Sequence, residues 1–540
     1  MNATTCDRLT CQPHTASQPL TLGLTIKDCT LALLLLLTIT SAAVAGSESD
    51  KKKEADAEPV DTSMATIPDA GEPPVITNHM VTVSQQTFRY TAEAGMLPLL
   101  KEDGTPQASV FYVAYTLSTT EDTRRRPIVF CFNGGPGAAA VWLHLGGLAP
   151  RRALVHADGS LPPPPYQVVP NEHTILPAAD LVFIDPVSTG FSRATKEDEA
   201  KQFYGKNQDI EAMAEFIRLY TARHKRWRSP KYLCGESYGV FRAAGLARQL
   251  QAKHGMFLNG LILVSGLVDY GTILSGPSND LPYTLFLPSF TAVAHAHGRL
   301  AKDLQADRDR TLIACQNFAA GDYLAALHAG AALPATRRIA IANELARFTG
   351  LSPQLILDHD LRIDPATFRE ELLADQGLIL GRFDGRITGR DGDRSDGTPQ
   401  FDPSYEAALG PLASTMNAYV REELGFESDL PYRVLTSVSP WPQDENRYSN
   451  TASQLKFAMS QNPHLRVFVQ TGICDLAVPF SSMRYSIDHL SLDPAIRDHV
   501  TYAEYESGHM MYLRFEDLAN LSRDLRHFLQ PPAATQNSRN

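Results

Sequence analysis

The stretch LCGESYGVFR, residues 233–242, places Ser237 between two glycines in the pattern G-x-S-x-G. The apolar residues before it are typical of a strand, and VFRAAGLARQLQ after it has the period of a helix. A strand–turn–helix of this kind holds a serine on a tight turn, where a Cβ on either flank would collide with backbone. The stretch therefore predicts a nucleophilic serine. A small polar residue in a glycine-rich bend is the alternative, since the chain has 35 glycines in 540 residues.

Three more short apolar runs share the form of the one before Ser237: PIVFCFNGGPG, DLVFIDPVSTG and LNGLILVSGL. Helical stretches separate the later runs, and in NQDIEAMAEFIRLYTARH the apolar residues recur on one face. This alternation predicts an α/β fold with a mostly parallel, buried central sheet and helices on both faces. Ahead of these runs, QQTFRYTAEA and ASVFYVAYTL flank the turn KEDGTP and predict an antiparallel hairpin.

From about residue 270 to residue 435 the strand pattern stops, and Ala- and Leu-rich segments of helical period replace it. Strands resume at HLRVFVQTG and HVTYAEYES, and a last amphipathic helix follows. We therefore expect one core domain with a mainly helical cap inserted into it. The expected organisation is a signal peptide at 1–45, a flexible acidic, proline-containing leader at 46–80, the two core parts at 81–269 and 436–530, the cap at 270–435, and a disordered tail at 531–540.

The segment LALLLLLTITSAAVAG is an apolar run followed by small residues that end in Ala43-Val44-Ala45. This pattern predicts a cleaved signal peptide and export, periplasmic or secreted, with no membrane span in the mature form; a retained anchor is the alternative. The net charge of −11 and the lack of long basic runs exclude an electrostatic footprint for nucleic acid. The sequence leaves the oligomeric state open.

Four cysteines lie beyond the predicted signal peptide. Three of them abut the motifs at strand ends, where a small apolar residue packs well, so buried thiols and disulfides both remain open. The four residues are Cys131, Cys234, Cys315 and Cys474.

A serine nucleophile needs a base, and the base needs an acid that orients it. Asp475 follows the predicted strand HLRVFVQTG, and His509 follows the last predicted strand, so both lie where the carboxyl ends of parallel strands meet. The order serine, acid, histidine along the chain is that of α/β-hydrolases. We therefore predict Ser237 as nucleophile, His509 as base and Asp475 as the orienting acid. A turn aspartate and a surface or core histidine are the alternatives.

The stretch CFNGGPGAAA follows another core strand, and its glycines let backbone N–H groups approach a substrate carbonyl. We predict an oxyanion hole formed by the N–H groups of Gly135 and Tyr238; a Gly/Pro turn that leads into a helix is the alternative. The sequence has neither a metal-ligand cluster nor a phosphate-binding glycine loop, so no metal and no cofactor are expected.

The motifs NGGPG (133–137), FIDPVSTGFS (183–192), GESYG (235–239), Asp475 with Pro479, and SGHM (507–510) together resemble the serine carboxypeptidase family of α/β-hydrolases. The resemblance covers about residues 85–270 and 465–530, and the cap resembles that of the family in position only. It implies the triad and oxyanion hole given above.

The resemblance also implies substrate-binding residues, because the family binds the C-terminal carboxylate of a peptide. These would be Asn133, Gly134 and Glu236. Glu236 can donate a hydrogen bond to a carboxylate only when it is protonated, so activity is expected to favour low pH. A structural acid bonded to backbone near the turn is the alternative for Glu236.

The sequence departs from the pattern of the family in three respects. Ala138, Ala139 and Ala140 stand where the family commonly has Cys-Ser-Ser, Cys131 stands where it often has Trp, and Gly147 aligns with a further family glutamate. These departures concern recognition of the terminal carboxylate. The expected function is an exported serine carboxypeptidase-like peptidase. An ester hydrolase or acyltransferase, and a catalytically silent homologue that binds a ligand or partner, are the alternatives.

Overall fold

The computed structural model describes residues 70–119, 122–390, 401–442 and 447–530. The chain divides into two compact units, 1–60 and 61–540, and every described residue belongs to the second. The predicted signal peptide, most of the predicted leader and the predicted tail lie outside the described residues. Within the described part no helix is long and apolar enough to cross a membrane.

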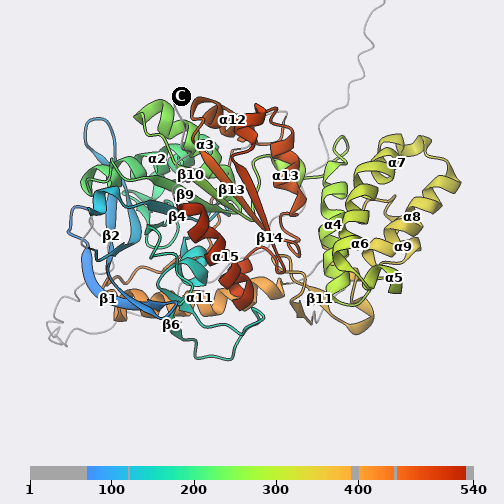
Figure 1. Ribbon diagram of the computed structural model, residues 1–540, viewed down its shortest axis with the longest axis horizontal. Coiled ribbons are helices and arrows are strands. Elements are labelled where there is room, and N and C mark those ends of the chain that lie inside the picture. Colours follow the sequence, from blue (N-terminus) through green and yellow to red (C-terminus); the bar gives the residue numbers. More distant parts are fainter. Residues whose placement is uncertain (1–69, 120–121, 391–400, 443–446, 531–540) are drawn as a thin grey trace, which may run out of the picture. The chain divides into compact units, whose positions relative to one another are not determined.

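A ten-stranded sheet forms the centre of the second unit (Figure 1). Its first strands are antiparallel, as predicted for the hairpin, and the strands from β7 to β14 are parallel to one another. The predicted α/β fold is confirmed. In spatial order the strands are β1 (Val75–Val83), β2 (Gln86–Leu100), β3 (Pro106–Leu117), β7 (Asp180–Ile184), β4 (Ile128–Phe132), β9 (Lys231–Glu236), β10 (Gly260–Val264), β13 (Arg466–Gly472) and β14 (Val500–Tyr505), with β8 (Arg193–Ala194) paired to β3.

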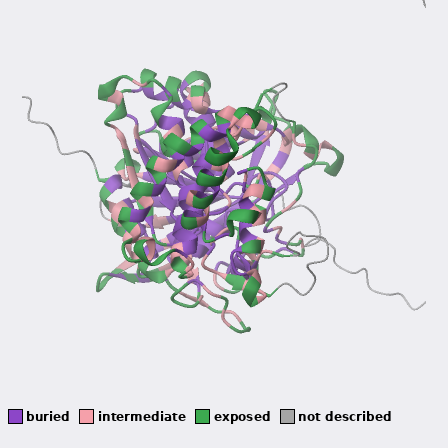
Figure 2. Cartoon of the chain, turned by 90° about the vertical axis from the view of Figure 1, so that its right-hand side faces the viewer, coloured by how far each residue is buried: buried purple, intermediate pink, exposed green. Residues whose placement is uncertain are grey.

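Helices cover both faces of the sheet, because alternate side chains of each central strand point to opposite sides. In β4, Phe130 and Phe132 pack with α2 (Lys206–Arg223), α3 (Tyr238–His254), α12 (Ala452–Gln461) and α13 (Ser481–Asp488). Cys131 points to the other face, which α15 (Phe515–Leu529) and α11 (Pro403–Glu422) cover. Figure 2 shows the buried sheet at the centre and exposed residues on the outer sides of the helices.

The four described cysteines are free and buried: Cys131 and Cys234 lie in the core cluster on the sheet, and Cys315 and Cys474 lie in the apolar cluster of the cap. Cys131 and Cys234 are partners in the register of β4 and β9. Of the two possibilities that the sequence left open, disulfides and buried thiols, the structure therefore has buried thiols.

The range expected for the cap divides between two packing clusters. A separate apolar cluster holds the helices from α4 to α10 together and also takes in Ile473 and Leu476, which border the predicted catalytic acid. Helix α11, although within residues 270–435, packs instead into the core cluster on the sheet through Leu412 and Met416. The cap helices are α4 (Leu281–Ala296), α5 (Lys302–Gln305), α6 (Arg308–Phe318), α7 (Leu324–Ala329), α8 (Ala335–Thr349), α9 (Pro353–Asp358) and α10 (Pro365–Glu371).

Shorter elements complete the fold. A π-helical turn, His144–Leu148, follows α1 and lies against the C-terminal segment after β14. The remaining short elements are α1 (Val141–Leu143), β5 (Arg151–Ala153), β6 (Val168–Pro170), β11 (Ile379–Leu380), β12 (Thr388–Gly389) and α14 (Pro494–Arg497).

Candidate active site

Ser237 lies on the turn between β9 and α3, with backbone angles φ 59° and ψ −125°. A non-glycine residue rarely adopts this conformation, which persists only where surrounding contacts hold it. The flanking glycines permit close packing: a Cβ at Gly235 would lie 2.1 Å from the carbonyl oxygen of Gly239, and a Cβ at Gly239 would lie 2.9 Å from that of Phe132. The structure therefore contains the strand, tight turn and helix expected around Ser237.

Asp475 and His509 come together beyond the ends of β13 and β14. The Nδ1 atom of His509 lies 2.6 Å from Oδ2 of Asp475, and both side chains are buried. The other carboxylate oxygen accepts hydrogen bonds from the N–H groups of Ala477 (2.7 Å) and Val478 (2.9 Å). These bonds hold the carboxylate facing the imidazole, which is the arrangement that an orienting acid requires.

The other imidazole nitrogen of His509, Nε2, is buried and has no hydrogen-bond partner among the described residues. Burial by itself lowers the pKa of His509, but the charge and hydrogen bond of Asp475, with the charge of Glu236, outweigh burial and leave the pKa above its usual value. Ser237 and His509 line one cavity. The unpaired Nε2 is thus available to a serine hydroxyl or to a leaving group.

Two backbone segments lie beside Ser237: the glycine-rich loop after β4 and the first turn of α3. Gly135 and Tyr238 line the same cavity as the serine. Tyr238 is the first residue of α3, and no side chain caps this helix, so its N-terminal N–H groups favour negative charge nearby. Gly134 packs against the turn so tightly that a Cβ there would lie 2.4 Å from the nitrogen of Tyr238. The backbone of Gly135, with φ 97°, is in a region that favours glycine.

Glu236, directly before the serine, is buried and lines the cavity beside Asn133. Burial raises the pKa of Glu236 to about 7, although His509 and hydrogen bonds from Tyr512 and Asn133 oppose the change. The hydroxyl of Tyr512 donates to Oε2 of Glu236 over 2.7 Å. Glu236 therefore carries a proton below about pH 7 and can then donate a hydrogen bond into the cavity.

Sequence reasoning did not identify Tyr512, which follows His509 by three residues. Its ring lies over a glycine pair: a Cβ at Gly146 would lie 2.4 Å from the ring, and a Cβ at Gly147 would lie 2.6 Å from Cβ of Tyr512. The lack of a side chain at Gly147 thus leaves room for the tyrosine. The signal in the sequence was the glycine pair itself, but its meaning depends on a contact between distant parts of the chain.

Arg242, on α3, is another residue that sequence reasoning missed. Its guanidinium is buried and binds both oxygens of Asp209, at 2.8 and 2.9 Å, and the carbonyl oxygen of Asn133 at 2.5 Å. It also lies over the rings of Phe132 and Tyr238. Arg242 therefore ties the glycine-rich loop after β4 to the turn that carries the serine.

A loop from the cap region, residues 381–387, lies between the loops that carry Asp475 and His509; we call it the bridging segment. The carbonyl of Arg382 accepts a hydrogen bond from the N–H of the residue after Asp475, at 3.1 Å. The carbonyl of Phe383 accepts one from the N–H of His509 at 2.6 Å, and its ring contacts the imidazole with centroids 5.1 Å apart. The bridging segment therefore sets the spacing of the two loops.

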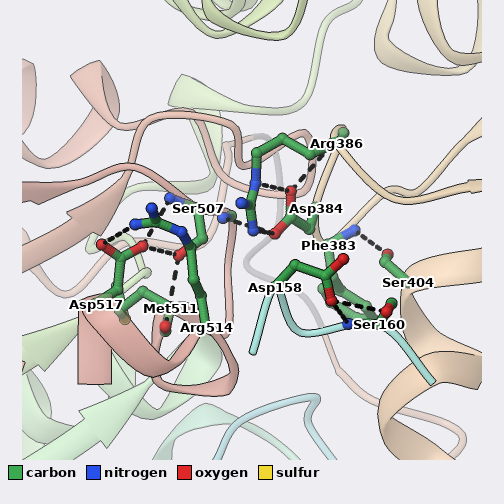
Figure 3. Close-up of polar contacts among 12 residues, drawn as sticks. Asp158, Ser160, Phe383, Asp384, Arg386, Ser404, Ser507, Met511, Arg514 and Asp517 are labelled. Atoms are coloured by element: carbon green, nitrogen blue, oxygen red, sulfur yellow. Dashed lines mark hydrogen bonds and ion pairs between the residues drawn. The ribbon is translucent and has the colours of Figure 1, made fainter. Parts of the chain in front are cut away.

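Side chains of the bridging segment add to this support (Figure 3). Oδ2 of Asp384 accepts a hydrogen bond from the N–H of Gly508 at 3.2 Å, and Arg386 binds both oxygens of Asp384, at 3.0 and 2.5 Å. A Cβ at Gly508 would lie 2.0 Å from the carbonyl oxygen of Phe383, so glycine permits this approach.

The loop after β14, which carries His509 and which we call the histidine loop, is also held by residues at the start of α15. Asp517 accepts hydrogen bonds from the N–H of Ser507 at 3.0 Å and from Nη1 of Arg514 at 2.9 Å, contacts that Figure 3 also shows. The backbone just before His509 is therefore fixed by the buried Asp517 at Ser507 and by the half-buried Asp384 at Gly508, which places the imidazole without help from a ligand.

The cavity has a volume of about 650 Å³. Its wall is mainly apolar, with Arg382, Glu236 and His509 as the ionisable side chains other than tyrosine among the described residues that line it. Within the described ranges no group of three or more His, Cys, Asp or Glu residues is arranged to hold a metal ion. A cavity of this volume with a mainly apolar wall suits an organic substrate rather than a single ion.

The sheet order and the flanking helices define the fold, which is that of the α/β-hydrolases. One solved structure with this arrangement is that of Kex1(delta)p, a prohormone-processing carboxypeptidase from Saccharomyces cerevisiae. It matches with a TM-score of 0.50 and 17% sequence identity, over 81% of this chain and 91% of that one.

The family follows from sequence comparison. Residues 84–283 match the family described as serine carboxypeptidase. The pheromone-processing carboxypeptidase KEX1 of S. cerevisiae is 34% identical over 156 residues, which are 27% of this chain and 20% of that protein. KEX1 of Komagataella phaffii is 35% identical over 201 residues, or 34% and 29% of the two chains. The chain thus aligns with only 20–29% of the length of these relatives. The predicted resemblance to the serine carboxypeptidase family is confirmed over residues 84–283.

Proposed function

We propose that this protein is a serine-type carboxypeptidase that hydrolyses the last peptide bond of its substrates. The observation that carries the proposal is Glu236, a buried acid with a pKa of about 7 that lines the cavity directly beside the nucleophile. In its protonated form it donates a hydrogen bond to the terminal carboxylate of a peptide, together with the side chain of Asn133 and the backbone of Gly134.

The proposed reaction proceeds in two halves. Ser237 Oγ attacks the carbonyl carbon while its proton moves to Nε2 of His509, and the N–H groups of Gly135 and Tyr238 stabilise the oxyanion. The C–N bond then breaks as His509 returns the proton to the leaving nitrogen, and an acyl-enzyme remains. Water attacks the acyl-enzyme with His509 as base, and Ser237 is released. Asp475 keeps the proton on Nδ1 and stabilises the imidazolium.

We also propose that the protein is exported. The support is the apolar run with its Ala43-Val44-Ala45 site, which lies outside the described residues. N-terminal sequencing of protein recovered from the periplasm or the medium tests this proposal. A mature chain beginning at Gly46 is expected, and an N-terminus upstream of the apolar run would contradict cleavage.

Two assays test the proposed activity. A fluorophosphonate should label the wild-type protein but not Ser237→Ala; an unlabelled, folded wild type would instead support a silent binding protein. A peptide with a free C-terminus should be cleaved faster than the same peptide as its C-terminal amide. Equal cleavage of the two, or cleavage of esters alone, would support an ester hydrolase or acyltransferase on the same fold.

A further inference from the structure

Arg382 brings a permanent positive charge to the wall of the active-site cavity. Its side chain is half exposed, and its guanidinium lies over the ring of Phe383, 4.5 Å from the centroid. That ring in turn contacts the imidazole of His509. The positive charge of Arg382 is close enough to the imidazole to lower the pKa of His509, against the larger effects that raise it.

The rest of the described cavity wall carries little charge that could compensate Arg382. Glu236 is protonated below about pH 7. Most other lining residues are apolar or aromatic, among them Trp142, Leu267, Ile273, Leu435, Val478 and Met510. An anionic group that enters the cavity in mildly acidic solution therefore meets a cationic side chain in partly apolar surroundings.

Arg382 is also held in place by its backbone. Its N–H donates to Oδ1 of Asp402 at 3.0 Å, and its carbonyl accepts from Leu476 at 3.1 Å. The side-chain pair with Asp402 is long, at 3.9 Å between Nε and Oδ2. Oδ1 of Asp402 accepts from the N–H groups of Ser404 and Tyr405, and Oδ2, the oxygen nearest Arg382, has no hydrogen-bond partner among the described residues. The two side chains therefore form an ion pair without a hydrogen bond, and the guanidinium keeps its N–H donors for a ligand.

The position of Arg382 beside His509 indicates which part of a substrate it contacts. In the proposed reaction the imidazole gives its proton to the leaving nitrogen, so the leaving residue must lie next to His509. Phe383 and Met510, which adjoin the imidazole in space or in sequence, lie on this side of the cavity with Arg382. The terminal carboxylate is assigned to Asn133 and Glu236, which leaves Arg382 for the side chain of the leaving residue.

We infer that Arg382 is a specificity-determining residue that selects substrates whose released residue has a carboxylate side chain, a C-terminal Asp or Glu. The inference rests on the proposed peptidase reaction. Arg382 forms a charge-assisted hydrogen bond with the side-chain carboxylate, while the protonated Glu236 binds the α-carboxylate of the same residue. A lysine or arginine at this place would meet like charge and is disfavoured.

The test uses peptides that differ only in a C-terminal Glu, Gln or Lys, assayed at pH 6 and low salt. At this pH Glu236 is protonated and the substrate side chain is ionised. The wild type should have a kcat/KM about tenfold higher for Glu than for Gln. Arg382→Gln should bring this ratio to about 1, Arg382→Lys should retain part of it, and Arg382→Glu should favour Lys. Because each ratio is measured within one variant, a general loss of activity cancels.

Arg523→Gln, an exposed arginine on α15, is the matched control and should leave the Glu/Gln ratio unchanged. In the wild type alone, raising the salt concentration should lower the ratio, which keeps the test open if a variant does not fold. A wild-type ratio near 1, or an unchanged ratio in Arg382→Gln, would overturn the inference. If the protein cleaves esters but no peptides, the proposed function fails, and the same comparison is made with esters whose leaving groups end in a carboxylate or a carboxamide.

Discussion

Substitution of Glu236 by glutamine should abolish the pH dependence of carboxylate recognition. Folding raises the pKa of Glu236 from 4.5 to about 7, because burial disfavours the charged form. The protonated fraction is then about 0.99 at pH 5 and about 0.09 at pH 8, so a hydrogen bond that needs the proton weakens recognition about 11-fold over this range. A glutamine amide donates at every pH and removes this decline.

The assay is the ratio of kcat/KM for a peptide acid to that for its C-terminal amide, measured from pH 5 to pH 8. The ratio isolates Glu236, because the titration of His509 affects both substrates equally. The wild-type ratio should fall about tenfold as the pH rises, and the ratio for Glu236→Gln should stay level. Glu211→Gln, an exposed glutamate on α2, is the matched control and should follow the wild type.

The same substitution has a consequence for stability. A pKa raised on folding stabilises the protein below the unfolded pKa of 4.5, and this stabilisation is lost as the pH rises through about 7. The change is at most about 3 kcal/mol, so Glu236→Gln should gain stability relative to the wild type between pH 5 and pH 8 in urea unfolding. A wild-type acid/amide ratio that does not vary with pH, or a glutamine variant that keeps the decline, would refute the assignment of Glu236.

Four further substitutions test the surroundings of the site. Tyr512→Phe removes a hydrogen bond that lowers the pKa of Glu236, so the decline of the acid/amide ratio should move to higher pH; an unmoved decline would contradict the contact. Asp475→Asn should lower kcat about 10⁴-fold in steady-state assays with the fold intact by circular dichroism, and a small loss would argue against its role as orienting acid. Arg242→Met leaves Asp209 buried without its partner and should cost about 3–5 kcal/mol in urea unfolding, whereas a neutral effect would mean that Arg242 is not an anchor. Asp384→Ala should lower kcat about tenfold with little change in KM, since it loosens the histidine loop without touching the substrate; an equal rise in KM would point to substrate binding.

Much of the fold could be predicted because its signals are local. A central strand buried on both faces, such as β4 or β10, must be a short continuous apolar run, and the turn after β9 must have glycine at positions 235 and 239. The positions of Asp475 and His509 could be predicted because parallel strands present their carboxyl ends at one edge of the sheet. Their contact with each other follows from this rule, and the roles of the triad remain predictions for the assays above.

The supports of the site could not be predicted, because each one joins residues far apart in the chain. Tyr512 reaches Glu236 across 276 positions, Arg242 reaches Asn133 across 109, and Asp384 reaches Gly508 across 124. No local period or turn preference encodes such pairs, since they depend on how packed elements approach one another. For the same reason the sequence placed α11 in the cap, whereas packing places it on the sheet.

The sequence by itself thus determined the order of strands and helices along the chain, the strained turn at Ser237 and the placement of Asp475 and His509 after the last two strands, because backbone sterics and burial act on neighbouring residues. Only the tertiary structure decided which side chains shift the pKa of Glu236, which ones hold the loops of Asp475 and His509, and which ones place Arg382 in the cavity wall. These properties arise from burial and charge among segments that meet only after folding.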